Sequence, residues 1–199
     1  MNPYKYLAKD PVLKKLIEKH GELVLPTQKQ YFRILCRAII SQQISNAAAA
    51  AVNRRFEALF VGIPTAKKVQ ETKPALIKAA GLSQKKVEYI KDLADHFLSR
   101  KITPRKFHSM SDEEIIEELV DVRGIGRWTA EMFIMFSLGR EDVFSYGDIG
   151  LLNNVYALYF GGEKVPKKSV EEVVDKWAPY RSIASLYLWK ATDDKDSPW

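Results

Sequence analysis

The sequence has few residues that could form disulfides, thiolate metal sites or membrane spans. Cys36 is the only cysteine among the 199 residues, which excludes an internal disulfide, a cysteine-based zinc site and a four-cysteine iron–sulfur cluster. It lies in an apolar run, so we expect a small buried core residue. No apolar run approaches membrane-spanning length, and the first residues lack the apolar region of a secretory signal. We expect an intracellular protein without a membrane partner, in the cytoplasm of a prokaryote or the nucleus of a eukaryote.

Strand-like alternation of apolar and polar residues is almost absent, whereas signals for helix ends recur along the whole chain. Asp10 precedes Pro11 as an N-cap precedes a first-turn proline. Ser111 and Glu114 have the spacing of a capping box. The sequence predicts an all-α protein of roughly ten helices, over residues 11–20, 28–43, 47–60, 74–80, 84–100, 112–119, 127–138, 149–159, 168–177 and 180–190.

The loops between these helices are short, and none has the composition of a linker between independent domains. The loop 139–147 mixes charged and aromatic residues and ends just before Asp148. A loop of this kind could cross between two helical lobes and place Asp148 in a cleft. We therefore expect residues 1–199 to form one unit of two lobes, a central lobe at about 36–136 and a second lobe made of about 1–35 with 137–199.

The net charge of +6 is compatible with a polyanionic partner. Many basic proteins bind nothing acidic, so the charge alone is weak evidence. The lysine pairs 67–68, 85–86 and 167–168 are expected to be solvated faces of helices. His20, His96 and His108 lie far apart without the spacing of metal ligands, and we assign them no role.

The most informative segment is 120–130, Val-Asp-Val-Arg-Gly-Ile-Gly-Arg-Trp-Thr-Ala. Gly124 and Gly126 allow a tight turn and a close approach to another surface, because they carry no Cβ. A helix begins directly after Gly126, so its free N–H groups could bind a phosphate. Asp148 follows about one helix and one loop further on. A phosphate anchor with a nearby carboxylate suggests chemistry on a nucleic acid.

The predicted helix 112–119, the turn 122–126 and the helix from Arg127 form a helix–hairpin–helix within 112–136. Together with Asp148, this segment resembles the helix–hairpin–helix DNA glycosylase superfamily, in particular its 3-methyladenine DNA glycosylase II branch. The resemblance extends from about Leu35 to Trp189, through the segments 38–45 and 177–182. Two positions depart from the family pattern: Arg123 stands where the hairpin often has proline, and Gly147 where relatives often carry another acid.

Position 128 distinguishes two mechanisms within this superfamily. Bifunctional relatives place a lysine there as the amine nucleophile for a Schiff base and strand cleavage, and Trp128 cannot form an imine. The scarcity of cysteine independently argues against the iron–sulfur type that resembles endonuclease III. The resemblance therefore implies monofunctional base excision without AP lyase activity.

The resemblance also assigns roles at the reaction centre. Asp148 would stabilise the cationic sugar and orient or deprotonate the attacking water, and a helix beginning near Ile149 would favour its charged form. The target base must be flipped out of the duplex, and an electron-rich aromatic pocket would hold it. That pocket would be lined by Trp128, Trp189, Met132 and Tyr146. The simpler alternatives are that Asp148 only caps a helix and that the aromatic residues only pack in the core.

Other residues would hold the DNA. Gln43 is the candidate wedge that fills the gap left by the flipped base. The N–H groups of Gly124 and Gly126 would bind a phosphate without reading sequence, assisted by Arg127 and Thr129. In the family, backbone carbonyls of the hairpin can also hold Na⁺ or K⁺, which here would be those of Val120, Val122 and Ile125. No other cofactor is expected.

The sequence thus predicts a monomeric DNA glycosylase that removes alkylated purines, of the 3-methyladenine and 7-methylguanine class, from double-stranded DNA and initiates base excision repair. Two alternatives stay open. The enzyme could remove deaminated or oxidised bases instead. The chain could also be a helix–hairpin–helix module that binds DNA without catalysis, although pure binding does not need Asp148 beside a phosphate anchor.

Overall fold

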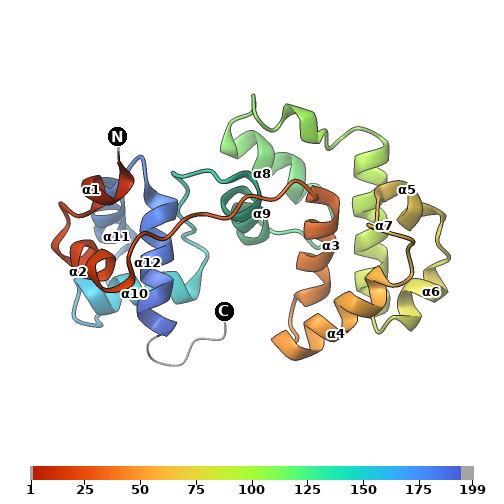
Figure 1. Cartoon of the computed structure of the whole chain (residues 1–199), viewed down its shortest axis with the longest axis horizontal. Coiled ribbons are helices and arrows are strands. Elements are labelled where there is room, and N and C mark those ends of the chain that lie inside the picture. Colours follow the sequence, from red (N-terminus) through yellow and green to blue (C-terminus); the bar gives the residue numbers. More distant parts are fainter. Residues whose placement is uncertain (1, 194–199) are drawn as a thin grey trace. The chain divides into compact units, whose positions relative to one another are not determined.

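The computed structural model describes the backbone of residues 2–193 and the side chains of residues 2–191. Over this part of the chain every regular element is a helix and none is a strand, which confirms the predicted all-α class (Figure 1). The chain divides into two compact units. Unit 1 comprises 1–27 and 134–199, and unit 2 comprises 28–133. The last residues of the expected second lobe, 194–199, lie outside the described residues.

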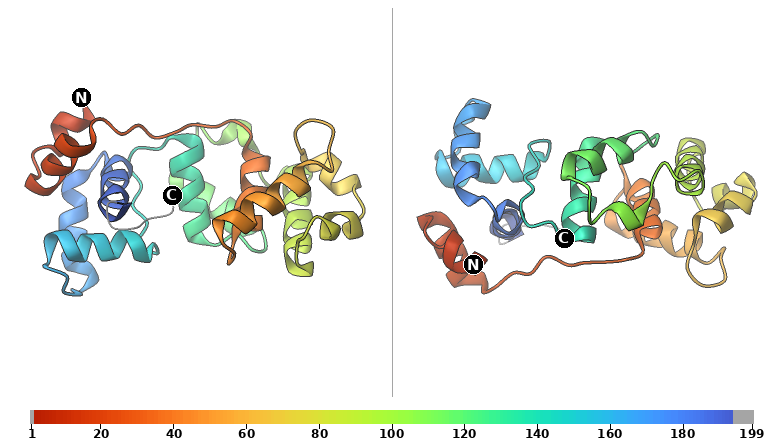
Figure 2. Two further views of the ribbon diagram at one scale, coloured as in Figure 1. Left: turned by 60° about the horizontal axis from the view of Figure 1, so that its bottom comes forward. Right: turned by 90° about the horizontal axis from the view of Figure 1, so that it is seen from above.

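Unit 2 is built around its longest helix, α7 (Gln84–Leu98), which packs against α3 and α5. The buried residues Val87, Ile90, Leu93 and Ala94 follow helical spacing on α7 and form its core face. Helices α8 and α9 pack side by side and are joined by the hairpin (Figure 2). The elements of unit 2 are α3 (Tyr31–Ser41), α4 (Asn46–Glu57), α5 (Ala66–Glu71), α6 (Pro74–Ala79), α7, η1 (Pro104–Lys106), α8 (Asp112–Val120) and α9 (Arg127–Phe133).

Unit 1 is organised by α12, which packs against α2 and α10. Tyr187 of α12 is buried, and its hydroxyl donates to the carbonyl of Gly21 at 2.7 Å and accepts from the backbone N–H of Leu23 at 3.1 Å. The N-terminal segment is thereby fastened to the C-terminal helix. The elements of unit 1 are α1 (Pro3–Leu7), α2 (Pro11–His20), η2 (Ile134–Leu138), α10 (Ile149–Tyr159), α11 (Lys167–Val174), η3 (Asp175–Trp177) and α12 (Arg181–Asp193).

The helix starts that the sequence predicted are confirmed by their hydrogen bonds. The Asp10 carboxylate accepts from the N–H groups of Val12 and Leu13 at 2.8 and 3.1 Å. Ser111 and Glu114 form the expected capping box. Each bond satisfies an N–H group that the helix itself leaves unpaired. Cys36 is buried as predicted, and burial raises the pKa of its thiol.

Other predicted bounds were wrong. The helix expected over 127–138 is two elements, because α9 ends at Phe133 and a π-helix follows over 134–138. The helix expected to reach residue 43 ends at Ser41, because Gln42 has an extended ψ of 134° and Gln43 a φ of +57°, neither of which a right-handed α-helix accommodates. The short helices α1 and α5 were not predicted at all.

Candidate functional site

The hairpin between α8 and α9 is a turn closed by its own backbone. The N–H of Val122 donates to the carbonyl of Leu119 at 3.2 Å, and the N–H of Ile125 donates to that of Val122 at 3.1 Å. Val122 and Ile125 are buried, whereas Val120 is exposed. The turn is therefore anchored by two apolar side chains that point into unit 2.

The two hairpin glycines have different structural roles. Gly124 has a φ of +87°, and a Cβ at this position would lie 2.2 Å from Cδ2 of Tyr89. Only glycine fits both the backbone and the space there. Gly126 has no such backbone requirement, and a Cβ added to it would meet nothing within 4 Å. Gly124 thus faces the protein interior, and Gly126 lies open at the start of α9.

Arg123, the departure from the usual proline, has a contact of its own. Its backbone N–H donates to Oδ2 of Asp92 at 2.8 Å, and its guanidinium lies 3.4 Å from Oδ1 of the same carboxylate. A proline would lack this N–H. The substitution therefore gives the hairpin an additional attachment to α7.

Gln42 connects the hairpin to the segment 42–45, which we call the junction because it joins α3 to α4. The side-chain amide of Gln42 donates to the carbonyl of Gly124 at 2.8 Å. The next residue, the predicted wedge Gln43, is exposed and has the positive φ noted above. The candidate wedge and the candidate phosphate anchor thus belong to one connected structure within unit 2.

Arg127 and Thr129 have surroundings that were not predicted from the sequence. Arg127 forms two 2.7 Å hydrogen bonds with Glu113 of α8 and a 3.0 Å bond with Glu131, and these raise the pKa of its guanidinium. It also lines a groove of about 480 Å³ with three carboxylates, those of Glu113, Glu117 and Asp121, a setting that disfavours a phosphate. The Thr129 side chain is buried. A phosphate-binding role for either side chain stays a prediction.

Asp148 lies directly before α10 and caps it. Its Oδ1 accepts from the backbone N–H of Leu151 at 2.7 Å. A Cβ at Gly150 would lie 3.3 Å from that oxygen, so the small residue leaves the cap room. The carboxylate is half-buried and has a defined orientation at a helix N-terminus, where negative charge is stabilised.

The loop that carries Asp148 is fastened to the start of α12. Ser182 is fully buried, and its hydroxyl accepts from the N–H of Val143 at 2.8 Å and donates to the carbonyl of Val143 at 3.2 Å. Arg181 pairs with the Asp142 carboxylate at 3.3 Å. These contacts attach two consecutive residues of the loop, Asp142 and Val143, to the start of α12 before the chain reaches Asp148.

The predicted pocket residues lie in both units. Trp128 and Met132 are one turn apart on α9 in unit 2, with Trp128 39% exposed. Trp189 lies in unit 1 with Asp148, and its ring is 5.7 Å from that of Phe136. Tyr146, also in unit 1, is 4.8 Å from the Phe144 ring and has the Lys167 ammonium 5.0 Å above its own.

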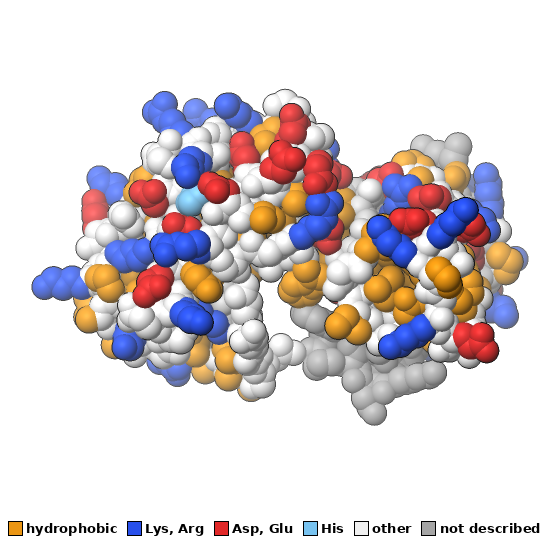
Figure 3. Space-filling model, turned by 180° about the vertical axis from the view of Figure 1, so that it is seen from behind, with side chains coloured by type: hydrophobic (Ala, Val, Ile, Leu, Met, Phe, Trp, Pro, Cys, Tyr) orange, Lys and Arg blue, Asp and Glu red, His pale blue; other side chains and the backbone are white. Residues whose placement is uncertain are grey.

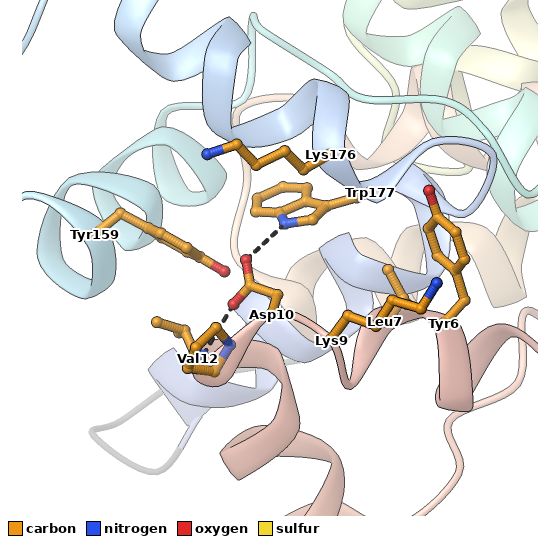
Figure 4. Close-up of a pocket in the computed structure, with 9 residues that line it drawn as sticks. Tyr6, Leu7, Lys9, Asp10, Val12, Tyr159, Lys176 and Trp177 are labelled. Atoms are coloured by element: carbon orange, nitrogen blue, oxygen red, sulfur yellow. Dashed lines mark hydrogen bonds between the residues drawn. The ribbon is translucent and has the colours of Figure 1, made fainter.

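A separate pocket of unit 1 contains none of the predicted site residues. It has a volume of about 480 Å³ and lies where α2 begins (Figure 4). The indole N–H of Trp177 donates to Oδ2 of Asp10 there at 3.3 Å. Burial, with the charge of Asp10, raises the pKa of the neighbouring Tyr159 hydroxyl. The Asp10 carboxylate in this pocket thus caps α2 and also accepts from Trp177.

Three further features of the described residues bear on other kinds of site. On the face shown in Figure 3, basic and acidic side chains are interspersed and the basic ones form no single patch. Among the described residues, no cluster of three or more His, Cys, Asp or Glu side chains could hold a metal ion. No described helix is both long and apolar enough to cross a membrane.

A helix–hairpin–helix in unit 2 and a helix-capping aspartate in unit 1 indicate the class to which this chain belongs. A family model of the HhH-GPD superfamily of base excision DNA repair proteins matches residues 36–179, so the chain is a member of that superfamily. The chain is 34% identical over 169 residues to DNA-3-methyladenine glycosylase 1 of Schizosaccharomyces pombe, covering 83% of this chain and 74% of the relative.

Two solved structures of DNA glycosylases are similar to this chain in fold and in sequence. The crystal structure of a DNA-3-methyladenine glycosidase from Bacillus halodurans has a TM-score of 0.90 and 38% identity, over 98% of this chain and 92% of that one. A 3-methyladenine DNA glycosylase of Schizosaccharomyces pombe, solved in complex with abasic DNA, has a TM-score of 0.84 and 29% identity, with 100% of both chains covered.

Proposed function

We propose that the chain is a monofunctional DNA glycosylase that hydrolyses the N-glycosidic bond of alkylated purines in duplex DNA, of the 3-methyladenine and 7-methylguanine class. The observation that carries this proposal is Asp148, a half-buried carboxylate whose orientation is fixed at the N-terminus of α10. The printed names of the relatives and of the solved structures support the substrate class. We further propose that the enzyme acts as a monomer.

Unit 2 would bind the DNA. The exposed Gly126 at the start of α9 leaves room for a phosphate to approach the backbone N–H groups. Gln43 would enter the duplex where the target nucleotide has left it. The carbonyls of Val120, Val122 and Ile125 would hold Na⁺ or K⁺ at the hairpin. The Val122 carbonyl already accepts from the N–H of Ile125 and would use its second lone pair for the cation.

Residues of each unit are proposed for base recognition, and Asp148 of unit 1 is proposed for bond cleavage. An alkylated purine is cationic, and the exposed face of Trp128 would attract it by stacking and by cation–π interaction. Met132 of the same helix is the second candidate for base contact in unit 2, and Tyr146 and Trp189 are the candidates in unit 1. As the glycosidic bond breaks, positive charge develops on the sugar, and the Asp148 carboxylate would stabilise it and orient the attacking water.

The test is the release of methylated bases from alkylated duplex DNA by the wild-type protein and by Asp148→Asn. We expect a loss of about 10²-fold or more in the variant, with unchanged affinity for a duplex that contains an abasic site. Equal release by the two proteins would refute the catalytic role of Asp148. Duplexes with deaminated or oxidised bases, assayed in parallel, determine whether alkylated purines are the preferred substrates.

The monofunctional mechanism has its own readout. Trp128 offers no amine to the sugar, so borohydride should trap no covalent adduct between the protein and lesion DNA. A trapped adduct would show that another amine of the chain forms a Schiff base and would contradict this mechanism.

A further inference from the structure

Helix α7 contacts both segments of unit 2 that are proposed to bind DNA, the junction and the hairpin. At its first turn, Lys86 donates through Nζ to the carbonyls of Ile40 and Gln42, both at 2.7 Å. These carbonyls lie at the end of α3, where a helix leaves its last acceptors unpaired. Burial lowers the pKa of Lys86. The expectation of a solvated lysine pair was therefore wrong for this residue, whose ammonium holds the start of the junction.

About one and two turns further along α7, Tyr89 and Asp92 hold the hairpin. The Tyr89 ring fills the space in front of Gly124 that a Cβ would need. The Asp92 carboxylate accepts the backbone N–H of Arg123 and pairs with its guanidinium. The position and the turn of the hairpin are therefore set by α7 as well as by α8 and α9.

His96 extends the same side of α7 to the start of the hairpin. It is buried, with Nδ1 2.8 Å from the Asp92 carbonyl and Nε2 3.0 Å from Oδ2 of Asp121. The Lys101 ammonium reaches the same carboxylate oxygen at 3.2 Å. The contact with His96, followed by that with Lys101, lowers the pKa of Asp121. Asp121 is the first residue after α8, so this contact fixes where the hairpin begins.

Lys86, Tyr89, Asp92 and His96 lie on one side of α7 at spacings of three, three and four residues. The opposite ends of this row hold two segments that are distant in sequence, and the Gln42–Gly124 hydrogen bond joins those segments directly. A displacement of α7 would therefore move Gln43 and the hairpin together.

We propose that this side of α7 is a positioning element for DNA binding and base flipping, in which Lys86 positions the wedge Gln43 and Asp92 positions the hairpin. The proposal rests on the function proposed above. Neither side chain touches the substrate; each acts through the segment that it holds.

The experiment compares Lys86→Met and Asp92→Ala with matched controls on the same helix. Lys85→Met and Asp95→Ala remove the same charges from neighbouring exposed positions of α7. The readouts are the dissociation constant for a duplex with an abasic site, KM and kcat for alkylated DNA, and the melting temperature. We expect Lys86→Met and Asp92→Ala to raise the dissociation constant and KM about tenfold, to change kcat less than twofold, and to exceed the controls in both effects.

A double substitution distinguishes positioning from general stability. Glycine tolerates the positive φ at position 43, so Gln43→Gly removes the wedge without backbone strain. If Lys86 acts through Gln43, adding Lys86→Met to Gln43→Gly should weaken binding by less than twofold further, and Lys86→Arg should restore wild-type binding. Additive losses in the double variant, or Lys86→Met and Asp92→Ala no worse than their controls, would overturn the proposal. Failure of the wild-type protein to excise any base, with DNA binding intact, would instead overturn the proposed function alone.

Discussion

Replacement of Gly124 by alanine should destabilise the protein severely, and the structure lets the loss be divided into two parts. The φ of +87° costs an L-residue about 1–2 kcal/mol. The new Cβ would also lie 2.2 Å from the Tyr89 ring, and such overpacking typically costs about 1–3 kcal/mol. We expect Gly124→Ala to lower the free energy of unfolding by about 2–5 kcal/mol, a large share of the stability of a typical domain.

Urea unfolding measures this loss, and Gly126→Ala is its matched control. The control adds the same methyl group two residues away, where nothing lies within 4 Å and φ is not in the left-handed region. Its free energy of unfolding should change by less than about 1 kcal/mol. Its affinity for DNA should nevertheless fall, because the added methyl group stands where a phosphate would approach.

Tyr89→Ala in the Gly124→Ala background tests the division into two parts. Removal of the ring should relieve the steric share of the loss and leave the backbone share of about 1–2 kcal/mol. The reasoning is refuted if Gly124→Ala is no more destabilising than Gly126→Ala. It is also refuted if the cost of Gly124→Ala is unchanged when Tyr89 is absent.

Two further substitutions test the attachments of the loop that carries Asp148 and of the unit 2 helices. Ser182→Ala leaves the N–H of Val143 without its acceptor, so it should lower the free energy of unfolding in urea by about 1–3 kcal/mol and should also lower kcat. Ser185→Ala is the control, because it loses only a bond within α12 and should not lower kcat. Arg33 and Arg37 lower the pKa of Glu57 from 4.5 to about 2, so this carboxylate contributes up to about 3 kcal/mol above pH 4.5, and the contribution is lost as the pH falls towards 2. The melting temperature of Glu57→Gln should therefore vary less over this pH range than that of the wild type. A variant whose melting temperature is as pH-dependent as that of the wild type would contradict the assignment. The control is Glu71→Gln, which removes an exposed carboxylate 3.9 Å from the Lys67 ammonium.

The parts of the fold that could be predicted from the sequence are those that local chemistry determines. Asp10 and the Ser111–Glu114 box cap their helices as expected, because a cap needs only the residue and the next turn of backbone. The π-helix after Phe133 has no local signal of this kind. It lies within a segment whose apolar pattern predicts one continuous α-helix.

In the candidate site, too, the features that local sequence determines could be predicted and the long-range contacts could not. Both hairpin glycines were evident from the sequence, but only the structure shows that the Tyr89 ring occupies the space at Gly124 and that the space at Gly126 is open. Ser182 and Lys86 were missed because each bonds to backbone groups more than thirty residues away. Backbone acceptors leave no mark in the sequence, so no pattern could have indicated either contact.

Asp148 could serve only as the cap of α10 or also act in catalysis, and the choice of substitution decides whether an experiment can distinguish these two roles. The carboxylate caps α10, so Asp148→Ala would remove the cap and the charge together, and a loss of activity could follow from either. Asparagine caps helices as well as aspartate does, and its side-chain oxygen can still accept from Leu151. Asp148→Asn should therefore melt within a few degrees of the wild type while it loses base release, whereas Asp148→Ala should lose both stability and activity. If Asp148→Asn keeps its activity and only Asp148→Ala loses it, the residue is a cap and the catalytic group lies elsewhere.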